Sequence, residues 1–235
     1  MIRQVTVFSI EIIVTLLLTI IALLVIKIFD FDFYFADLIY SVDNTWTYTR
    51  SWLYSTLIHN YAKKFIILLF LIFLSHIIYV LKTQKGNENI RPKVILIFAI
   101  VAGTLTVSIL KVFFDVDCPW DLIKYGGEKP FFELFNYDSK YLPSSRCFPA
   151  AHASVGFTLI SIYFYCRIHC QKYKYPTFIL ALTIGFTFGF AQQMRGAHFL
   201  SHTLWSLIIC ITVNIIIYAT AYRKNTRTTK VYLNT

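Results

Sequence analysis

The sequence predicts an all-α, polytopic membrane protein, and two observations lead to this fold class. Hydrophobic residues make up 57% of the 235 residues, charged residues make up only 14%, and the mean hydropathy is +0.61. A soluble domain carries about 25% charged residues, so the excess of apolar side chains requires lipid. The apolar residues also gather in blocks that are long enough to cross a bilayer as helices.

Six such blocks are predicted to span the membrane. Each has about 17 to 25 residues, enough at ~1.5 Å per residue to cross a hydrocarbon core of ~30 Å. The first block has no small-residue cleavage site after it, so we expect it to remain as a helix. The fourth begins with the polar His152 and Ser154. The six blocks form one membrane domain over residues 1–235, with spans at 5–29, 65–81, 94–114, 150–169, 177–193 and 200–221.

The segment between the first two spans, 30–64, is amphipathic and rich in aromatic residues. This composition predicts short helices that lie along the membrane interface. Trp52 and His59 in this segment are candidate contacts of a lipid entrance, and the alternative is that they are simple interfacial anchors.

The distribution of basic residues predicts the orientation of the bundle. With the N-terminus inside, the inner segments hold twelve Lys and Arg residues and one acid, Glu88, whereas the outer segments hold nine basic residues and ten acids. Orientation normally follows the excess of Lys and Arg, so both termini are predicted to be cytoplasmic. The loops at 115–149 and 194–199 then face outward. The net charge of +10 is explained by this asymmetry, and we expect no nucleic-acid partner.

Two short histidine motifs occur in these outward loops: FPAAH at 148–152 and RGAH at 195–198. His152 and His198 each lie where a loop is expected to become a helix, and free N–H groups at a helix start favour an oxyanion. Imidazole and charged side chains at membrane depth usually line a functional cavity. The motifs therefore predict an outward-facing phosphate pocket, completed by Lys111, Arg146 and Arg195. The alternative is that the histidines only cap helices at the interface.

The order and spacing of these residues resemble the type-2 phosphatidic acid phosphatase family, whose motifs are KxxxxxxRP, PSGH and SRxxxxxHxxxD. Lys111 matches the first motif, His152 the second and His198 the third. Other positions depart from the pattern: Cys118 replaces arginine, Ala150 and Ala151 replace serine and glycine, Gln192 replaces arginine, and His202 replaces aspartate. The strings CPWDLIKYGG, CFPAAHAS and QQMRGAHFLSHTLW are similar to a bacterial branch of the family. Arg146 and Arg195 are interpreted as substitutes for the missing arginines.

The resemblance implies a metal-independent phosphatase that uses no cofactor. His198 would attack phosphorus to form a phosphohistidine, and His152 would protonate the leaving oxygen and then assist water. Lys111, Arg146 and Arg195 would neutralise the phosphate oxygens in the transition state.

The replacement of aspartate by His202 leaves the orientation of the nucleophile open. A neutral His202 could orient His198 only by accepting a hydrogen bond, and Asp121 is a second candidate for this role. His198 and His202 also have the four-residue spacing of a helical metal site, for which His152 would be the third ligand. That metal site is an alternative to the metal-free enzyme.

Cys118 and Cys147 are the two cysteines in outward loops, so a disulfide between them is one expectation and two unpaired thiols are the other. Cys166 and Cys170 are expected to be free thiols near the cytoplasm.

We therefore predict a multi-pass phosphatase of a bacterial inner membrane, which hydrolyses a lipid phosphate monoester or diphosphate at the periplasmic face. The candidate substrates implied by the resemblance are lipid A phosphates, undecaprenyl diphosphate, phosphatidylglycerophosphate and phosphatidic acid. Two alternatives stay open. One is a protein that binds or transports lipid phosphates without hydrolysing them. The other is an enzyme that transfers phosphate between lipids.

Overall fold

A computed structural model of the protein describes residues 9–40, 45–83, 90–114, 116–132 and 145–222. In these residues the chain is helical, with one isolated bridge between Leu122 and Lys129, as the composition predicts. The elements are α1 (Ile10–Ile28), α2 (Phe31–Tyr40), η1 (Thr47–Arg50), η2 (Trp52–Ala62), α3 (Lys63–Thr83), α4 (Arg91–Phe113), η3 (Pro119–Asp121), η4 (Ile123–Tyr125), α5 (Ala151–Phe157), α6 (Ile160–His169), η6 (Gln171–Tyr173), α7 (Lys174–Met194) and α8 (Leu200–Ala221).

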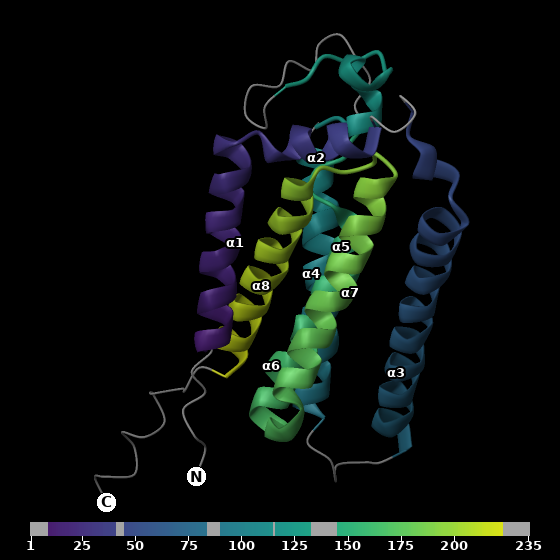
Figure 1. Ribbon diagram of the computed structural model, residues 1–235. Coiled ribbons are helices and arrows are strands. Elements are labelled where there is room, and N and C mark those ends of the chain that lie inside the picture. Colours follow the sequence, from purple (N-terminus) through teal and green to yellow (C-terminus); the bar gives the residue numbers. More distant parts are fainter. Residues whose placement is uncertain (1–8, 41–44, 84–89, 115, 133–144, 223–235) are drawn as a thin grey trace, which may run out of the picture.

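The long helices run side by side along one axis, and α2 lies across their upper end (Figure 1). The start of α1 and the end of α8 lie at the lower end. The start of α4 is there as well, where Arg91 Nη2 donates to the carbonyl oxygen of Ala221 at 2.7 Å. The start of α5, the end of α7 and the start of α8 meet at the upper end, beneath α2. The histidine motifs therefore belong to a single end of the bundle.

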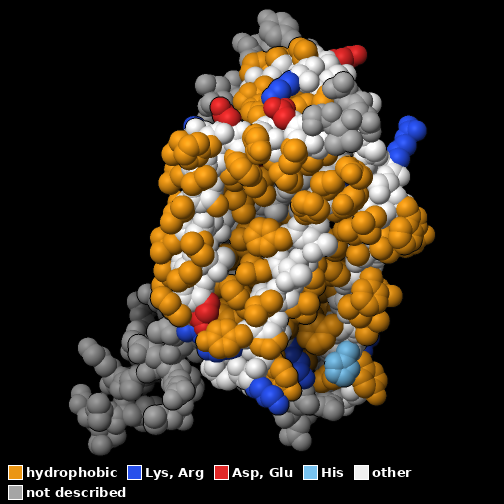
Figure 2. Space-filling view, in the orientation of Figure 1, with side chains coloured by type: hydrophobic (Ala, Val, Ile, Leu, Met, Phe, Trp, Pro, Cys, Tyr) orange, Lys and Arg blue, Asp and Glu red, His pale blue; other side chains and the backbone are white. Residues whose placement is uncertain are grey.

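Five helices are long and apolar enough to cross a membrane: Ile10–Ile28, Trp52–Val80, Arg91–Phe113, Gln171–Met194 and Leu200–Ala221. Large apolar side chains are exposed along them; Leu18, for example, is 61% exposed and Leu180 is 55% exposed. In Figure 2 these apolar side chains cover the visible face of the bundle, and the charged ones gather towards its two ends. Such a surface fits lipid and not water, so the chain is a multi-pass membrane protein.

The predicted fourth span, 150–169, is divided into α5 and α6 at Thr158 and Leu159. The hydroxyl of Thr158 donates to the carbonyl oxygen of Ile100 in α4 at 2.8 Å, which holds the break against a neighbouring helix. Each half is shorter than a span, so a sixth crossing by the two halves together stays a prediction.

The short helices predicted for segment 30–64 are present as α2 and η1, whereas residues 52–62 belong to a longer helix. The position of the segment at the membrane interface stays a prediction. Helix α2 lies across the end of the bundle, as an interfacial helix would. Residues 52–62, however, form the π-helix η2, which continues without interruption into α3, so that both belong to one apolar helix. The aromatic residues suggested a separate surface helix, but aromatic residues are also common at the ends of spanning helices.

Close helix packing and buried polar contacts hold the centre of the bundle together. The backbones of α5 and α7 approach so closely that a Cβ on Gly156 would overlap the backbone of Gly185. The hydroxyl of Ser161 donates to Asn214 Oδ1 at 2.7 Å, and the hydroxyl of Tyr218 donates to the carbonyl oxygen of Ser161 at 3.0 Å. Small residues and interhelical hydrogen bonds are typical of helix contacts in membranes, and here they fix the helices that carry the site.

Candidate active site

Backbone contacts tie the three motif segments to one another at the upper end of the bundle. The amide of Cys147 donates to the carbonyl oxygen of Val116 at 2.7 Å, which joins the first motif to the second. The amide of Ala150 donates to the carbonyl oxygen of His202 at 3.3 Å, which joins the second to the third. Three segments that are distant in sequence are therefore held as one unit.

The loop that carries His198 requires a glycine at position 196. Gly196 has a φ of 76°, in the left-handed region that ends many helices, and its amide donates to the carbonyl oxygen of Gln193 at 2.9 Å. A Cβ on Gly196 would also overlap the ring of Trp46. This turn ends α7 and directs the chain back into the bundle.

His198 and His202 are the buried histidines of the site, and each is only 4% exposed. Their ring centroids lie 5.8 Å apart. Burial lowers the pKa of His198 well below its ordinary value, and His202, Lys111 and His152 lower it further; a backbone hydrogen bond at Cys147 acts in the opposite direction. His198 is therefore neutral around pH 7, with a ring nitrogen lone pair available for chemistry.

The Nδ1 atoms of His198 and His202 are buried and have no hydrogen-bond partner among the described residues. An aspartate in place of His202 would supply an acceptor beside His198, but a second imidazole does not bring a compensating charge.

The predicted phosphate-binding residues Lys111 and Arg195 lie around His152. Lys111 and Arg195 both act electrostatically on the His152 ring. Arg195 is held in place by its Nε, which donates to the carbonyl oxygen of Thr49 at 3.3 Å, and by its Nη1, which donates to Gln192 Oε1 at 3.1 Å. Burial lowers the pKa of Arg195, although its ordinary value is so high that the guanidinium keeps its charge. The site is therefore strongly cationic.

Two further basic groups come from the N-terminal half of the chain. His59 in η2 stacks on His152, with ring centroids 4.0 Å apart and an interplanar angle of 28°. Lys63, at the start of α3, acts electrostatically on His59, Lys111 and His152. The sequence did not predict the contact between His59 and His152, because a π-helix leaves no recognisable spacing in the sequence.

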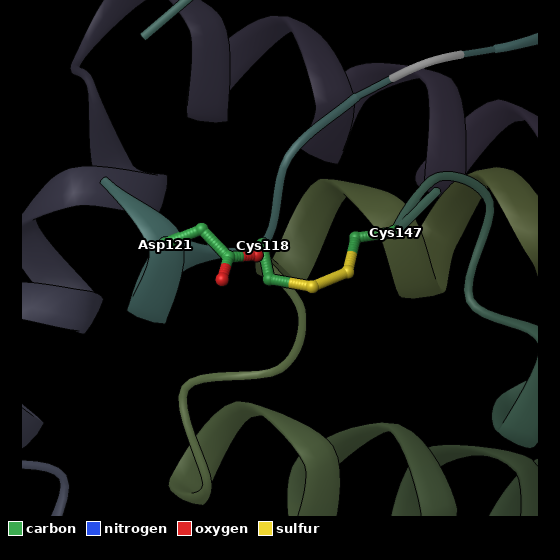
Figure 3. A group of neighbouring side chains, drawn as sticks. All are labelled: Cys118, Asp121 and Cys147. Atoms are coloured by element: carbon green, nitrogen blue, oxygen red, sulfur yellow. A yellow bond between two sulfur atoms is a disulfide. The ribbon is translucent and has the colours of Figure 1, made fainter. Parts of the chain in front are cut away.

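The structure places Arg146 and Asp121 beside the disulfide. Cys118 and Cys147 are joined, with Cα atoms 5.2 Å apart. A carboxylate oxygen of Asp121 lies within 4.8 Å of both sulfur atoms (Figure 3). The Oδ2 atom of Asp121 is buried without a hydrogen-bond partner among the described residues. Arg146 is exposed, with a φ of 51°. Neither residue is among the groups that act most strongly on His198, which are His202, Lys111 and His152.

The metal-site alternative finds no support in the arrangement of the histidines. In the described parts of the chain, the group of side chains whose ligand atoms lie within 4.8 Å of one another is Cys118, Asp121 and Cys147, and it does not include His152, His198 or His202. Because the two cysteines of that group form a disulfide, they offer no thiolate to a metal.

Comparisons with known proteins agree with the motif assignment. A family model described as the PAP2 superfamily matches residues 92–226, which include all three motif segments. No curated protein and no solved structure matches the chain.

Proposed function

Because the chain belongs to the PAP2 superfamily, whose members act as phosphatases on phosphate esters, we propose that it hydrolyses a phosphate monoester or diphosphate of a membrane lipid. One observation carries this proposal: a buried, neutral His198 lies in a cluster with His152, Lys111 and Arg195 at the end of a membrane bundle. Neutral imidazole is a nucleophile, and the cations suit a phosphate group.

The proposed reaction has two steps. A ring nitrogen of His198 attacks phosphorus, and the bond from phosphorus to the lipid oxygen breaks. His152, whose protonated form the bound phosphate anion favours, gives its proton to the leaving oxygen. Neutral His152 then takes a proton from water, which attacks the phosphohistidine, and the phosphorus–nitrogen bond breaks to release inorganic phosphate. Lys111 and Arg195 stabilise the charge on the phosphate oxygens in both transition states.

The lipid nature of the substrate is supported by the position of the site. The cluster lies at the end of helices whose outer surfaces are apolar, so a phosphate on a lipid headgroup would meet the site at the level of the interface. The disulfide and the excess of basic residues in the opposite segments favour an outward orientation, which in a bacterium is the periplasmic face.

A second candidate function is lipid-phosphate binding without hydrolysis, and the unpartnered Nδ1 atoms of His198 and His202 favour it. Without a carboxylate at position 202, the positive charge that develops on His198 during attack is less well stabilised. Transfer of the phosphate to a second lipid differs from hydrolysis only in the acceptor of the second step.

The test is phosphate release by the purified protein from a panel of lipid phosphates, in the presence of EDTA. We expect release by the wild type, loss of at least about 1000-fold in His198→Ala, since the nucleophile is removed, and normal release by His76→Ala. His76 is an exposed residue of α3 and is the matched control. Binding of the lipids without release, in folded wild-type protein, would overturn the proposed hydrolysis in favour of binding. Appearance of a new phosphorylated lipid would identify transfer.

A further inference from the structure

The π-helix η2 brings a histidine into the site that the family motifs do not contain. His59 lies at the eighth of the eleven positions of η2, whose bounds are Trp52 and Ala62, and its ring stacks on His152 with centroids 4.0 Å apart. Short π-helical segments occur frequently at functional sites. Residues 52–62 lie outside the part of the chain that matches the superfamily, 92–226, so His59 is not part of the matched motifs.

A chain of two hydrogen bonds determines which nitrogen of His59 carries the proton. Arg195 Nη1, which can only donate, bonds to Gln192 Oε1 at 3.1 Å. The amide nitrogen of Gln192 therefore faces His59 and lies 2.7 Å from its Nδ1. Because an amide NH₂ group can only donate, Nδ1 accepts, and in the neutral ring the proton is on Nε2. His59 is thus prepared as a hydrogen-bond donor through Nε2.

The surroundings of His59 favour an anion as the acceptor of that proton. The charged groups that act on the ring are Arg195 and Lys63, and Lys63 also acts on His152 and Lys111. These are all basic groups, and cationic side chains held together in a partly buried site repel one another until an anion neutralises them. Gln192, which occupies the position of a motif arginine, is engaged by Arg195 and His59 and does not supply a charge itself.

We propose that His59 is a substrate-binding residue that donates a hydrogen bond from Nε2 to an oxygen of the phosphate held by His152 and Arg195. Together with Arg195, it fulfils the role that the arginine of the third motif would have at position 192. This inference deepens the proposed function and rests on it for the identity of the ligand as a phosphate ester. The alternative is a purely structural role, in which His59 only fastens η2 to α7 through Gln192.

Two substitutions separate binding from structure. In His59→Asn, the side-chain oxygen replaces Nδ1 as the acceptor for Gln192, but the Nε2 donor is lost. In His59→Gln, the side-chain nitrogen reaches the former position of Nε2. We expect about a tenfold rise in KM for His59→Asn, because one hydrogen bond to a charged group is removed. We expect partial recovery in His59→Gln and wild-type values in the control His76→Asn, which is on the same long helix.

A binding measurement makes the result independent of hydrolysis. Inorganic vanadate, a phosphate mimic, is titrated into the full-length protein and followed by calorimetry and by the ¹⁵N resonances of the histidine rings. The proposal is supported if His59→Asn weakens vanadate binding by about tenfold, with unchanged thermal stability, and it stands on this result even if the wild type hydrolyses no lipid. The proposal is overturned if His59→Asn binds vanadate and processes substrate as the wild type does. In that case, a loss of activity in His198→Ala would still support the proposed phosphatase function. If His59→Asn binds vanadate more weakly only because the variant is less stable, the proposal is also overturned, in favour of the structural role of His59.

Discussion

Asp32 accepts a hydrogen bond from the backbone amide of Ser201 at 3.0 Å, so a carboxylate of α2 caps the first turn of α8. The residue that precedes α8 in sequence, Phe199, makes no side-chain cap of its own. Helix α2 thus supplies a carboxylate at the positive end of α8, the helix that carries His202 and follows the loop of His198. This contact explains why α2 lies across the end of the bundle and links it to the geometry of the site.

Substitution of Asp32 is expected to destabilise the protein. Asp32→Ala removes the acceptor of a partly buried amide at the start of α8, which costs about 1 kcal/mol. Asp32→Asn keeps an acceptor oxygen and costs less. Thermal unfolding in detergent at neutral pH measures both. Equal stability of Asp32→Ala and the wild type would show that the cap contributes nothing.

The stability difference between wild type and Asp32→Asn is also expected to depend on pH. Burial raises the pKa of Asp32, and the hydrogen bonds from Ser201 and Leu200 only partly oppose this. The folded state therefore holds the proton more tightly than the unfolded state, so the wild type gains stability as the pH falls through the raised pKa towards the unfolded value and loses it as the pH rises. The asparagine variant does not titrate at this position and gives the baseline. A difference that grows with rising pH would contradict the shift.

Removal of the disulfide is expected to lower both stability and activity. Cys118 and Cys147 are 29 residues apart in sequence, and closing a loop of this length stabilises the folded state by about 3 to 4 kcal/mol through chain entropy. Because the backbone of Cys147 contacts the site histidines, a looser segment also disturbs His198. The variant with Cys118→Ser and Cys147→Ser should unfold earlier, as should the reduced wild type, whereas Cys170→Ser, an exposed free thiol, should not. Insensitivity to reductant would exclude this role.

Gly156→Ala is expected to destabilise the bundle through packing alone. An added Cβ would overlap the backbone of Gly185, and a backbone cannot move aside as a flexible side chain can. Overpacking of this kind costs about 1 to 3 kcal/mol, which a lowered midpoint of thermal unfolding would report. Leu180→Ala, on an exposed part of the same neighbouring helix α7, is the control and should change little. A stable Gly156→Ala variant would mean that α5 and α7 pack less closely.

The elements that the sequence predicted well are those that depend on length and composition. The last span, 200–221, corresponds to α8 (Leu200–Ala221), and 177–193 lies within α7 (Lys174–Met194). Apolar blocks of this length have few alternatives to a helix in lipid. The break at Thr158 was not predictable, because its hydroxyl bonds to a helix that is distant in sequence.

The site also contains residues that the sequence predicted and residues that it did not. Lys111, Arg195, His152 and His198 lie near one another as the motif order predicts, because each motif lies at the same end of its helix. His59 could not be assigned to the site, since its place depends on a π-helix and on a tertiary contact with Gln192. Asp121 is close to the first motif in sequence, and a carboxylate oxygen of its side chain lies within 4.8 Å of both sulfur atoms of the disulfide. Nearness in sequence does not determine where a loop side chain points.

The most informative single substitution restores the motif residue that the chain lacks. His202→Asp would place a carboxylate beside the ring of His198, whose centroid lies 5.8 Å from that of His202 and whose Nδ1 has no partner among the described residues. The carboxylate would orient the ring and stabilise the positive charge that forms during attack on phosphorus. We expect kcat to rise by about tenfold at pH 7 to 8. Assays of phosphate release across pH measure this effect.

The pH profile of kcat/KM shows in which direction His202→Asp shifts the pKa of His198. In the wild type, burial and the neighbouring groups hold the pKa of His198 well below its ordinary value, so the acid limb that belongs to the nucleophile lies at low pH. A carboxylate at position 202 favours the imidazolium and raises that pKa, so the acid limb of kcat/KM moves to higher pH even as the plateau rises. The uncharged isostere His202→Asn removes the influence of His202 on the pKa of His198 but adds no charge, so it should move the limb less than His202→Asp does. An unmoved limb in His202→Asp, with the protein folded, would show that position 202 does not act on His198.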